Sequence, residues 1–209
     1  MTPTHSAGGV SFGNNYAILN LDLMTILVDT AKGTAAGDTF IHNFSRWNET
    51  VHRKEPRPLT IFTSLSLSSG EPELARDAPF TKLVHSFGSF EAGSKDVGLS
   101  PSLLLDENDI VLQKTRWYAG AGNSLEQILR AQKVDTVIIS GLTLSGVVMS
   151  TIYRLFDLDY NIYVIYDNVL ELPVDDHSEA FKVVLETVLS KMNLTMLSVQ
   201  EALEALARS

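Results

Sequence analysis

The sequence predicts an α/β fold with three layers, in which helices cover both faces of a mostly parallel, Rossmann-like sheet. Short apolar segments typical of buried strands alternate along the chain with segments whose apolar residues recur at helical spacing. Such alternation implies right-handed crossover connections and therefore parallel strands. The 209 residues suffice for one domain with a continuous core, and no linker, repeat or low-complexity tract divides them.

Strands are predicted where apolar residues run for a few positions between turn residues. The first such segment ends in an acid, Asp22, and the third is closed by a base, Lys114. The predicted strands are residues 16–22, 59–63, 110–113, 136–140 and 161–166.

Helices are predicted where apolar residues return every three or four positions. The clearest case places Phe40, Phe44, Trp47 and Val51 on one stripe. A later helix is expected to turn Val148, Ile152, Leu155 and Phe156 inward. The predicted helices are residues 38–53, 125–132, 145–158, about 176–192 and 197–207.

Two segments lack such periodicity. Residues 1–15 are polar and glycine-rich, without the basic and apolar regions of a signal peptide, so we expect a flexible N-terminal segment before a domain at 16–209. Residues 64–106 are rich in Ser, Gly and Pro. A segment of that length without clear elements usually lines a site or contacts a partner.

Composition excludes several functional classes. A net charge of −9 argues against nucleic acid as a partner, because phosphate binding needs a cationic surface. The chain contains no cysteine, which excludes disulfides, thiolate metal ligands and thiol catalysis. No apolar run approaches the ~20 residues of a membrane helix. We therefore expect a cytoplasmic protein that acts on a small molecule.

Asp22 and Lys114 are the leading candidates for chemistry. Both follow directly on predicted strands, and ligands of parallel sheets bind beyond the carboxyl ends of the strands. If the two strands are neighbours, the lysine can compensate a desolvated carboxyl group and form a proton-transfer unit with it. The alternative is a structural ion pair that ties two strand ends together.

The turn after Gly141 and the aromatic pair Trp117 and Tyr118 are weaker candidates. Unpaired backbone N–H groups near Gly146 and Val147, at the start of a helix, can hold an anion; alternatively the glycines only permit a tight turn. Trp117 and Tyr118 stand in a glycine-rich stretch and form either a pocket wall or a core or subunit contact.

Metal, cofactor and serine chemistry receive no support from the sequence. The histidines show no metal-ligand spacing, and only His85, in the irregular stretch, merits attention. Gly120 to Gly122 is too short for a nucleotide-binding fingerprint. Ser145 and Ser150 have no nearby arrangement of histidine and acid. We expect no metal and no cofactor.

Four motifs in order, over roughly residues 16–193, resemble the isochorismatase-like hydrolase superfamily. Residues 19–24 resemble the first strand with its catalytic aspartate, Asp22, and residues 111–119 resemble the lysine motif around Lys114. Residues 138–148 resemble the strand and glycine turn, and residues 163–168 the late strand. Six residues after Gly141, where most members keep a nucleophilic cysteine, this chain has Val147.

The resemblance implies about six parallel strands, a homodimer or homotetramer, and a cis peptide between Leu142 and Thr143. It also implies a hydrolase that works without a thiol, as isochorismatases do. In those enzymes the aspartate protonates an enol (vinyl) ether such as isochorismate, and water completes the hydrolysis. The residues expected to contact substrate on this basis are Leu65, Trp117, Tyr118, Leu144, Gly146 and Val147.

Three positions depart from the isochorismatase pattern and predict a more apolar pocket. Leu65 and Met24 stand where a glutamine is usual, and Val147 is bulkier than the usual glycine. Two alternatives therefore stay open. The chain is either a non-catalytic binding or assembly protein, or an isomerase, dehydratase or cyclase that uses the same acid and lysine on a different substrate.

Overall fold

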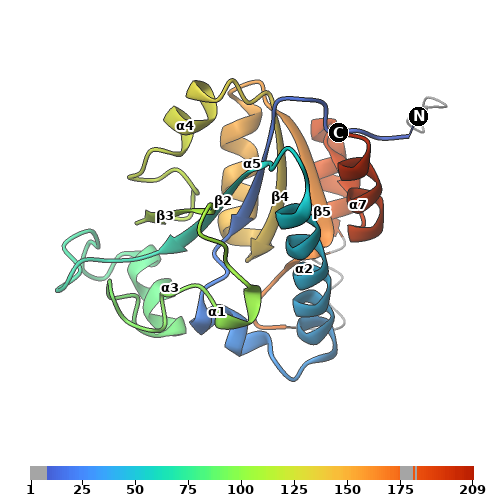
Figure 1. Ribbon diagram of the computed structural model, residues 1–209. Coiled ribbons are helices and arrows are strands. Elements are labelled where there is room, and N and C mark those ends of the chain that lie inside the picture. The colour runs from blue at the N-terminus through green and yellow to red at the C-terminus, as the bar shows by residue number, and fades with distance from the viewer. Residues whose placement is uncertain (1–8, 175–180, 182) are drawn as a thin grey trace.

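The computed structural model describes residues 9–174, 181 and 183–209. Its strands form one six-stranded sheet in the order β3-β2-β1-β4-β5-β6, in which every neighbouring pair is parallel (Figure 1). The predicted α/β class and parallel sheet are confirmed. The strands are β1 (Tyr16–Leu21), β2 (Leu59–Leu65), β3 (Ile110–Lys114), β4 (Thr136–Leu142), β5 (Asn161–Leu170) and β6 (Thr195–Leu197).

Helices cover both faces of this sheet. On one face, α4, α5 and the turns before β6 pack on the side chains of Leu19, Leu21 and Ile139. On the other face, α2 and α7 pack on Ile18 and Ile138. The α-helices are α1 (Thr25–Ala31), α2 (Ala35–Arg53), α3 (Pro79–Phe87), α4 (Leu125–Ala131), α5 (Met149–Phe156) and α7 (Val199–Ala207). Shorter helical segments are the 3-10 helices η1 (Pro101–Leu103) and η4 (Leu189–Met192) and the π-helices η2 (Leu144–Val148) and η3 (Val184–Val188).

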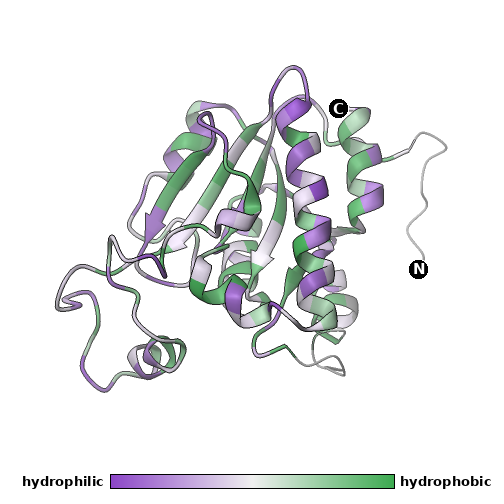
Figure 2. Cartoon of the chain, turned by 60° about the horizontal axis from the view of Figure 1, so that its bottom comes forward, coloured by the Kyte–Doolittle hydropathy of each residue, from purple (hydrophilic) through white to green (hydrophobic). Residues whose placement is uncertain are grey.

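Helix α2 shows how the hydrophobic pattern becomes a layer. Its apolar stripe, Phe40, Phe44, Trp47 and Val51, is fully buried, and the opposite face is polar, as Figure 2 shows by hydropathy. Thr34 begins the helix, because its side chain accepts a hydrogen bond from the Gly37 N–H at 3.0 Å. The helix therefore starts three residues before the predicted boundary.

The central strands approach closely at the edge of the sheet where the candidate residues lie. Gly141 of β4 pairs with Leu21 of β1, and a Cβ at Gly141 would come within 2.1 Å of the Leu21 carbonyl oxygen. Its φ of 138° also lies where side chains are rarely tolerated. Only glycine allows β4 to run beside the end of β1 at this point.

The irregular stretch 64–106 contains more structure than its composition indicates. It holds helix α3 and turn η1, and its backbone is tied to the loop after β1, where the Ser100 N–H donates to the Leu23 carbonyl at 2.9 Å. Figure 1 shows α3 beside α1 at the carboxyl ends of the strands. The segment therefore covers the edge where a parallel sheet binds ligands.

Other elements differ from the predicted ones. Strand β6 was not predicted, and α7 begins after it, at Val199. Phe156, predicted to face inward, is 42% exposed, because α5 ends there and the chain turns away. The start of the helix predicted at about 176 and residues 1–8 of the N-terminal segment lie outside the described residues. Phe12, within the described part of that segment, is buried against Tyr163.

The Leu142–Thr143 peptide is cis, as the family resemblance implies. In the described part of the chain, no helix is both long and apolar enough to cross a membrane.

Truncating Phe44 tests the packing of α2. Phe44→Ala should lower the free energy of unfolding by about 3–5 kcal/mol, because it leaves a cavity between α2 and the sheet. Phe156→Ala removes the same side chain from an exposed helical position and should cost less than about 1 kcal/mol. Urea unfolding of both variants measures the difference, and equal losses would contradict the assigned core.

Candidate active site

Asp22 is fixed in an unusual backbone conformation just past the end of β1. Its φ is 54°, in the left-handed region. Its N–H donates to the carbonyl and the hydroxyl oxygen of Thr63 on β2, both at 3.1 Å, and the Thr63 hydroxyl donates back to Oδ1 at 2.7 Å. Thr63 therefore holds both the backbone and the carboxyl group of Asp22.

Lys114 reaches Asp22 across an intervening strand. β2 lies between β1 and β3, so the two residues do not lie on neighbouring strands. Their pairing had been expected only between neighbouring strands. The Lys114 stem nevertheless brings Nζ to 2.7 Å from Asp22 Oδ2. Two strand spacings are about 9.5 Å, a distance that a lysine and an aspartate can cover together.

The ammonium group of Lys114 is fully satisfied within the protein. Besides Asp22, it donates to the Arg116 carbonyl at 2.8 Å and the Trp117 carbonyl at 3.1 Å. Three acceptors around one nitrogen match the three donors of a protonated lysine. The chain bend at residues 116–117 therefore supplies the two remaining acceptors of the Lys114 ammonium group.

Burial shifts the pKa of both partners. Desolvation raises the pKa of Asp22, and the charge and hydrogen bond of Lys114 and the hydrogen bond of Thr63 oppose this shift. Desolvation likewise lowers the pKa of Lys114, against the effect of Asp22. The two pKa values therefore lie closer together than those of the free side chains, and groups whose pKa values approach each other exchange protons more readily.

A cavity of about 160 Å³ opens onto Asp22. Its walls come from several parts of the chain, mainly the loops that follow β1, β3, β4 and β5, the end of β2, and helices α1 and α3. Most of the wall is apolar. The lining residues are Asp22, Met24, Leu27, Leu65, Leu83, Val84, Phe87, Phe90, Trp117, Leu142, Thr143, Ser145, Val147, Glu171 and Leu172.

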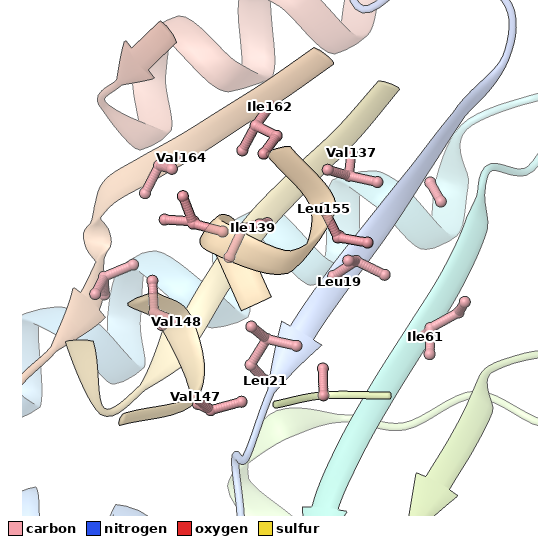
Figure 3. Packing of buried hydrophobic residues seen from close by; sticks show 14 of the residues in the cluster. Leu19, Leu21, Ile61, Val137, Ile139, Val147, Val148, Leu155, Ile162 and Val164 are labelled. Carbon is pink, nitrogen blue, oxygen red and sulfur yellow. The ribbon is translucent and has the colours of Figure 1, made fainter. Parts of the chain in front are cut away.

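Val147, at the position of the missing nucleophile, forms part of this wall. It is 2% exposed and belongs to the same core cluster as Leu21 and Val148; Figure 3 shows all three at the lower end of that cluster. The isopropyl group offers no reactive atom. The ionisable side chains that line the cavity in the described part of the chain are those of Asp22 and Glu171.

The other predicted contact residues divide into two groups. Leu65 and Trp117 line the cavity with Asp22. Leu144 is buried in the core beside it, Gly146 packs near the Trp117 ring, and Tyr118 donates its hydroxyl to Glu126 at 2.8 Å; none of these three lines the cavity. His85 pairs with Glu71 at 2.7 Å and does not line the cavity either.

Several residues of the site could not be predicted from the sequence. Thr63 lies inside a strand and showed no motif. Leu83, Val84 and Phe87 belong to α3, whose helical spacing was obscured by the surrounding loop residues. Glu171 follows β5, which is longer than predicted. Because the predicted strand ended at residue 166, the place of Glu171 one residue past the strand end was not visible in the sequence.

The Glu171 carboxylate accepts a hydrogen bond from a backbone N–H at the start of η2. Its Oε2 accepts the Ser145 N–H at 2.6 Å, and its Oε1 accepts the Leu172 N–H at 3.1 Å. The turn expected to hold an external anion is thus approached by the protein's own carboxylate. Within the described ranges, no group of three or more His, Asp or Glu side chains is placed to hold a metal ion.

A parallel sheet with an aspartate and a lysine at its carboxyl edge, next to a glycine turn and a cis peptide, defines an isochorismatase-type hydrolase fold. The family model described as Isochorismatase domain matches residues 16–199, so the chain belongs to the isochorismatase family. No curated protein matches the chain.

Solved structures support the same fold. An isochorismatase family protein from Burkholderia thailandensis has 18% identity and a TM-score of 0.75, covering 96% of this chain and 100% of that one. A cysteine hydrolase from Pseudomonas syringae pv. phaseolicola has 14% identity and a TM-score of 0.79, covering 98% and 99%. N-carbamoylsarcosine amidase from Thermoplasma acidophilum has 19% identity and a TM-score of 0.69, covering 89% and 97%.

Breaking the ion pair tests its energetics. Lys114→Met should destabilise the protein by about 3–5 kcal/mol near neutral pH, because the Asp22 carboxylate is left buried without a cation. The folded-state pKa of Asp22 is raised above its unfolded value, so folding becomes less favourable as pH rises between the two values. The loss should therefore shrink as pH falls, because the buried carboxyl group becomes protonated.

Urea unfolding near neutral pH and at a series of lower pH values measures this effect. The double variant Asp22→Asn, Lys114→Met removes both charges and should be more stable at neutral pH than Lys114→Met alone. A loss that is independent of pH and unrelieved in the double variant would show that the pair is not electrostatically coupled.

Proposed function

We propose that this protein is a cysteine-independent hydrolase in which Asp22 acts as a general acid on a small enol ether. Lys114 is its electrostatic partner. Membership of a family that includes hydrolases supports the class. The observation that carries the mechanism is the buried Asp22–Lys114 pair, 2.7 Å long, at the floor of an apolar cavity whose nucleophile position holds Val147.

The chemistry needs one proton and one water molecule. Protonated Asp22 delivers its proton to the terminal vinyl carbon, which leaves an oxocarbenium ion. Water adds to the cationic carbon and returns a proton to the Asp22 carboxylate. The resulting hemiketal collapses, the C–O bond to the alcohol breaks, and a carbonyl product and an alcohol leave.

The surrounding groups suit each stage of this sequence. Oδ1 and Oδ2 of Asp22 accept from Thr63 and Lys114, and each oxygen keeps a second lone pair for the transferred proton. Lys114 stabilises the carboxylate that forms after proton transfer. The apolar wall excludes bulk water, which strengthens these interactions.

Substitutions at the pair test the proposal. Pyruvate release from isochorismate and acetaldehyde release from ethyl vinyl ether should fall at least about 100-fold in Asp22→Asn, because the proton donor is lost. Product release by Lys114→Ala should fall by a similar factor. Circular dichroism and unfolding curves select conditions in which both variants are folded. Full turnover by folded Asp22→Asn would refute the proposal.

The pH dependence of kcat/KM gives a second test. The rate should decline as pH rises through the pKa of Asp22, because the protonated form is the donor, and burial places this decline above the ordinary range of an aspartate. The Thr63 hydroxyl lowers the pKa of Asp22, so Thr63→Val should move the decline to higher pH.

Thr63→Ser keeps the hydroxyl group and is the matched control for this measurement. Its profile should coincide with that of the wild type. A rate that rises with pH, or a profile that Thr63→Val leaves in place, would exclude Asp22 as the acid.

A non-catalytic binding protein is the second candidate. It is favoured by Val147, which fills part of the cavity wall at the position of the family nucleophile. Calorimetry that detects ligand binding to the cavity, together with no turnover of enol ethers, amides or esters, would support this candidate over the enzyme. Formation of an isomerised, dehydrated or cyclised product would instead indicate the alternative enzyme reactions.

A further inference from the structure

Glu171 brings a second carboxyl group into the cavity that holds Asp22. It follows directly on β5 and lines the cavity wall together with Ser145 and Leu172. Its two oxygens accept the Ser145 N–H at 2.6 Å and the Leu172 N–H at 3.1 Å. Backbone N–H groups position this carboxylate but do not neutralise it.

The charges around the cavity therefore do not balance. Asp22 is compensated by Lys114, whose other two donors are used by the carbonyls of Arg116 and Trp117. No lysine, arginine or histidine stands among the described residues that line the cavity. The Arg116 guanidinium lies over the Phe80 ring, 5.1 Å from its centroid, and does not line it either. While the Asp22–Lys114 ion pair is formed, Glu171 leaves the lining with one uncompensated negative charge.

This charge bears directly on which substrates can bind. Isochorismate carries two carboxylates, and Glu171 would repel them at the short distances that a small cavity imposes. The backbone donor at the start of η2 that could receive a substrate carboxylate is already bound by Glu171. A carboxylate substrate thus meets a repelling charge and no free cation on the described wall.

We infer that Glu171 determines specificity by charge: it excludes carboxylate-bearing substrates and selects small, uncharged ones. This inference rests on the proposed function, and it narrows the substrate class to uncharged enol ethers. The free lone pairs of Glu171 accept a hydroxyl or amide donor at one end of such a molecule. The apolar wall formed by Leu65, Leu83 and Phe87 packs against the rest.

Binding of two ligands that differ in charge tests the inference without turnover. Benzamide and benzoate share a ring and a similar shape, and calorimetry measures the affinity of each. Wild type should bind benzamide at least about ten-fold more tightly than benzoate. Glu171→Gln keeps an acceptor for the Ser145 N–H and removes the charge, so it should raise benzoate affinity at least about ten-fold and leave benzamide within about three-fold.

Glu107→Gln is the matched control, because Glu107 is exposed before β3 and its substitution changes net charge equally. It should alter neither affinity. A purely structural role for Glu171 would lower stability in Glu171→Gln without changing the ratio of the two affinities. The inference would be overturned if wild type bound benzoate as tightly as benzamide, or if it did not bind benzamide at all. It would also be overturned if Glu171→Gln gained no affinity for benzoate.

Turnover separates this inference from the proposed function. The quantity to compare is the ratio of kcat/KM for isochorismate to kcat/KM for ethyl vinyl ether. This ratio should be at least about ten-fold higher in Glu171→Gln than in wild type. If folded Asp22→Asn keeps full turnover while the charge preference follows Glu171, the mechanism fails and the specificity role stands. If Asp22→Asn is inactive and the preference is unchanged in Glu171→Gln, the mechanism stands and the specificity role fails.

Discussion

The ion pair between Asp22 and Lys114 is the constraint around which the edge of the sheet is organised. The two charges are almost wholly buried, with side chains 7% and 0% exposed, so each needs partners that replace water. Thr63 supplies one on β2, and the bend at 116–117 supplies two carbonyls to Lys114. Three adjacent strands and the loop after β3 must therefore keep their relative register for the pair to be stable.

The position of Gly141 follows from the same constraint. Asp22 leaves β1 at a positive φ, directly after the residue that β4 approaches most closely. A side chain at Gly141 would collide with the Leu21 carbonyl and displace the end of β1. The glycine turn thus serves the geometry of the carboxyl group, in addition to starting the turn that carries Val147.

The cavity combines one neutral ion pair, one further carboxylate and apolar walls. Val147 offers no nucleophilic atom to the cavity, and proton transfer by Asp22 is the chemistry that we propose there. Glu171 occupies the start of η2, where an external anion would otherwise be received. Both residues lie on the shared backbone framework of the family fold, so the differences that they make to the site are differences of side chain.

Local patterns identified most of the framework, because strand and helix periodicity depends on which face of each element is buried. The apolar stripe of α2 and the strands ending near Asp22 and Lys114 were predictable for this reason. Phe156 was placed wrongly, because periodicity does not show where a helix ends against its neighbours. Strand β6 has three residues, and α3 lies in a loop-rich stretch, so neither had enough periodic positions to be recognised.

The sequence by itself determined the fold class, the family and the two strand-end charges, because these depend on residue type and spacing along the chain. It also determined that no thiol chemistry is possible. Only the tertiary structure decided that Lys114 reaches Asp22 across β2, that Thr63 and Glu171 join the site, and that Tyr118 turns away to Glu126. Those features depend on strand order and on contacts between residues up to 92 positions apart in the numbering, such as Asp22 and Lys114, which no local pattern encodes.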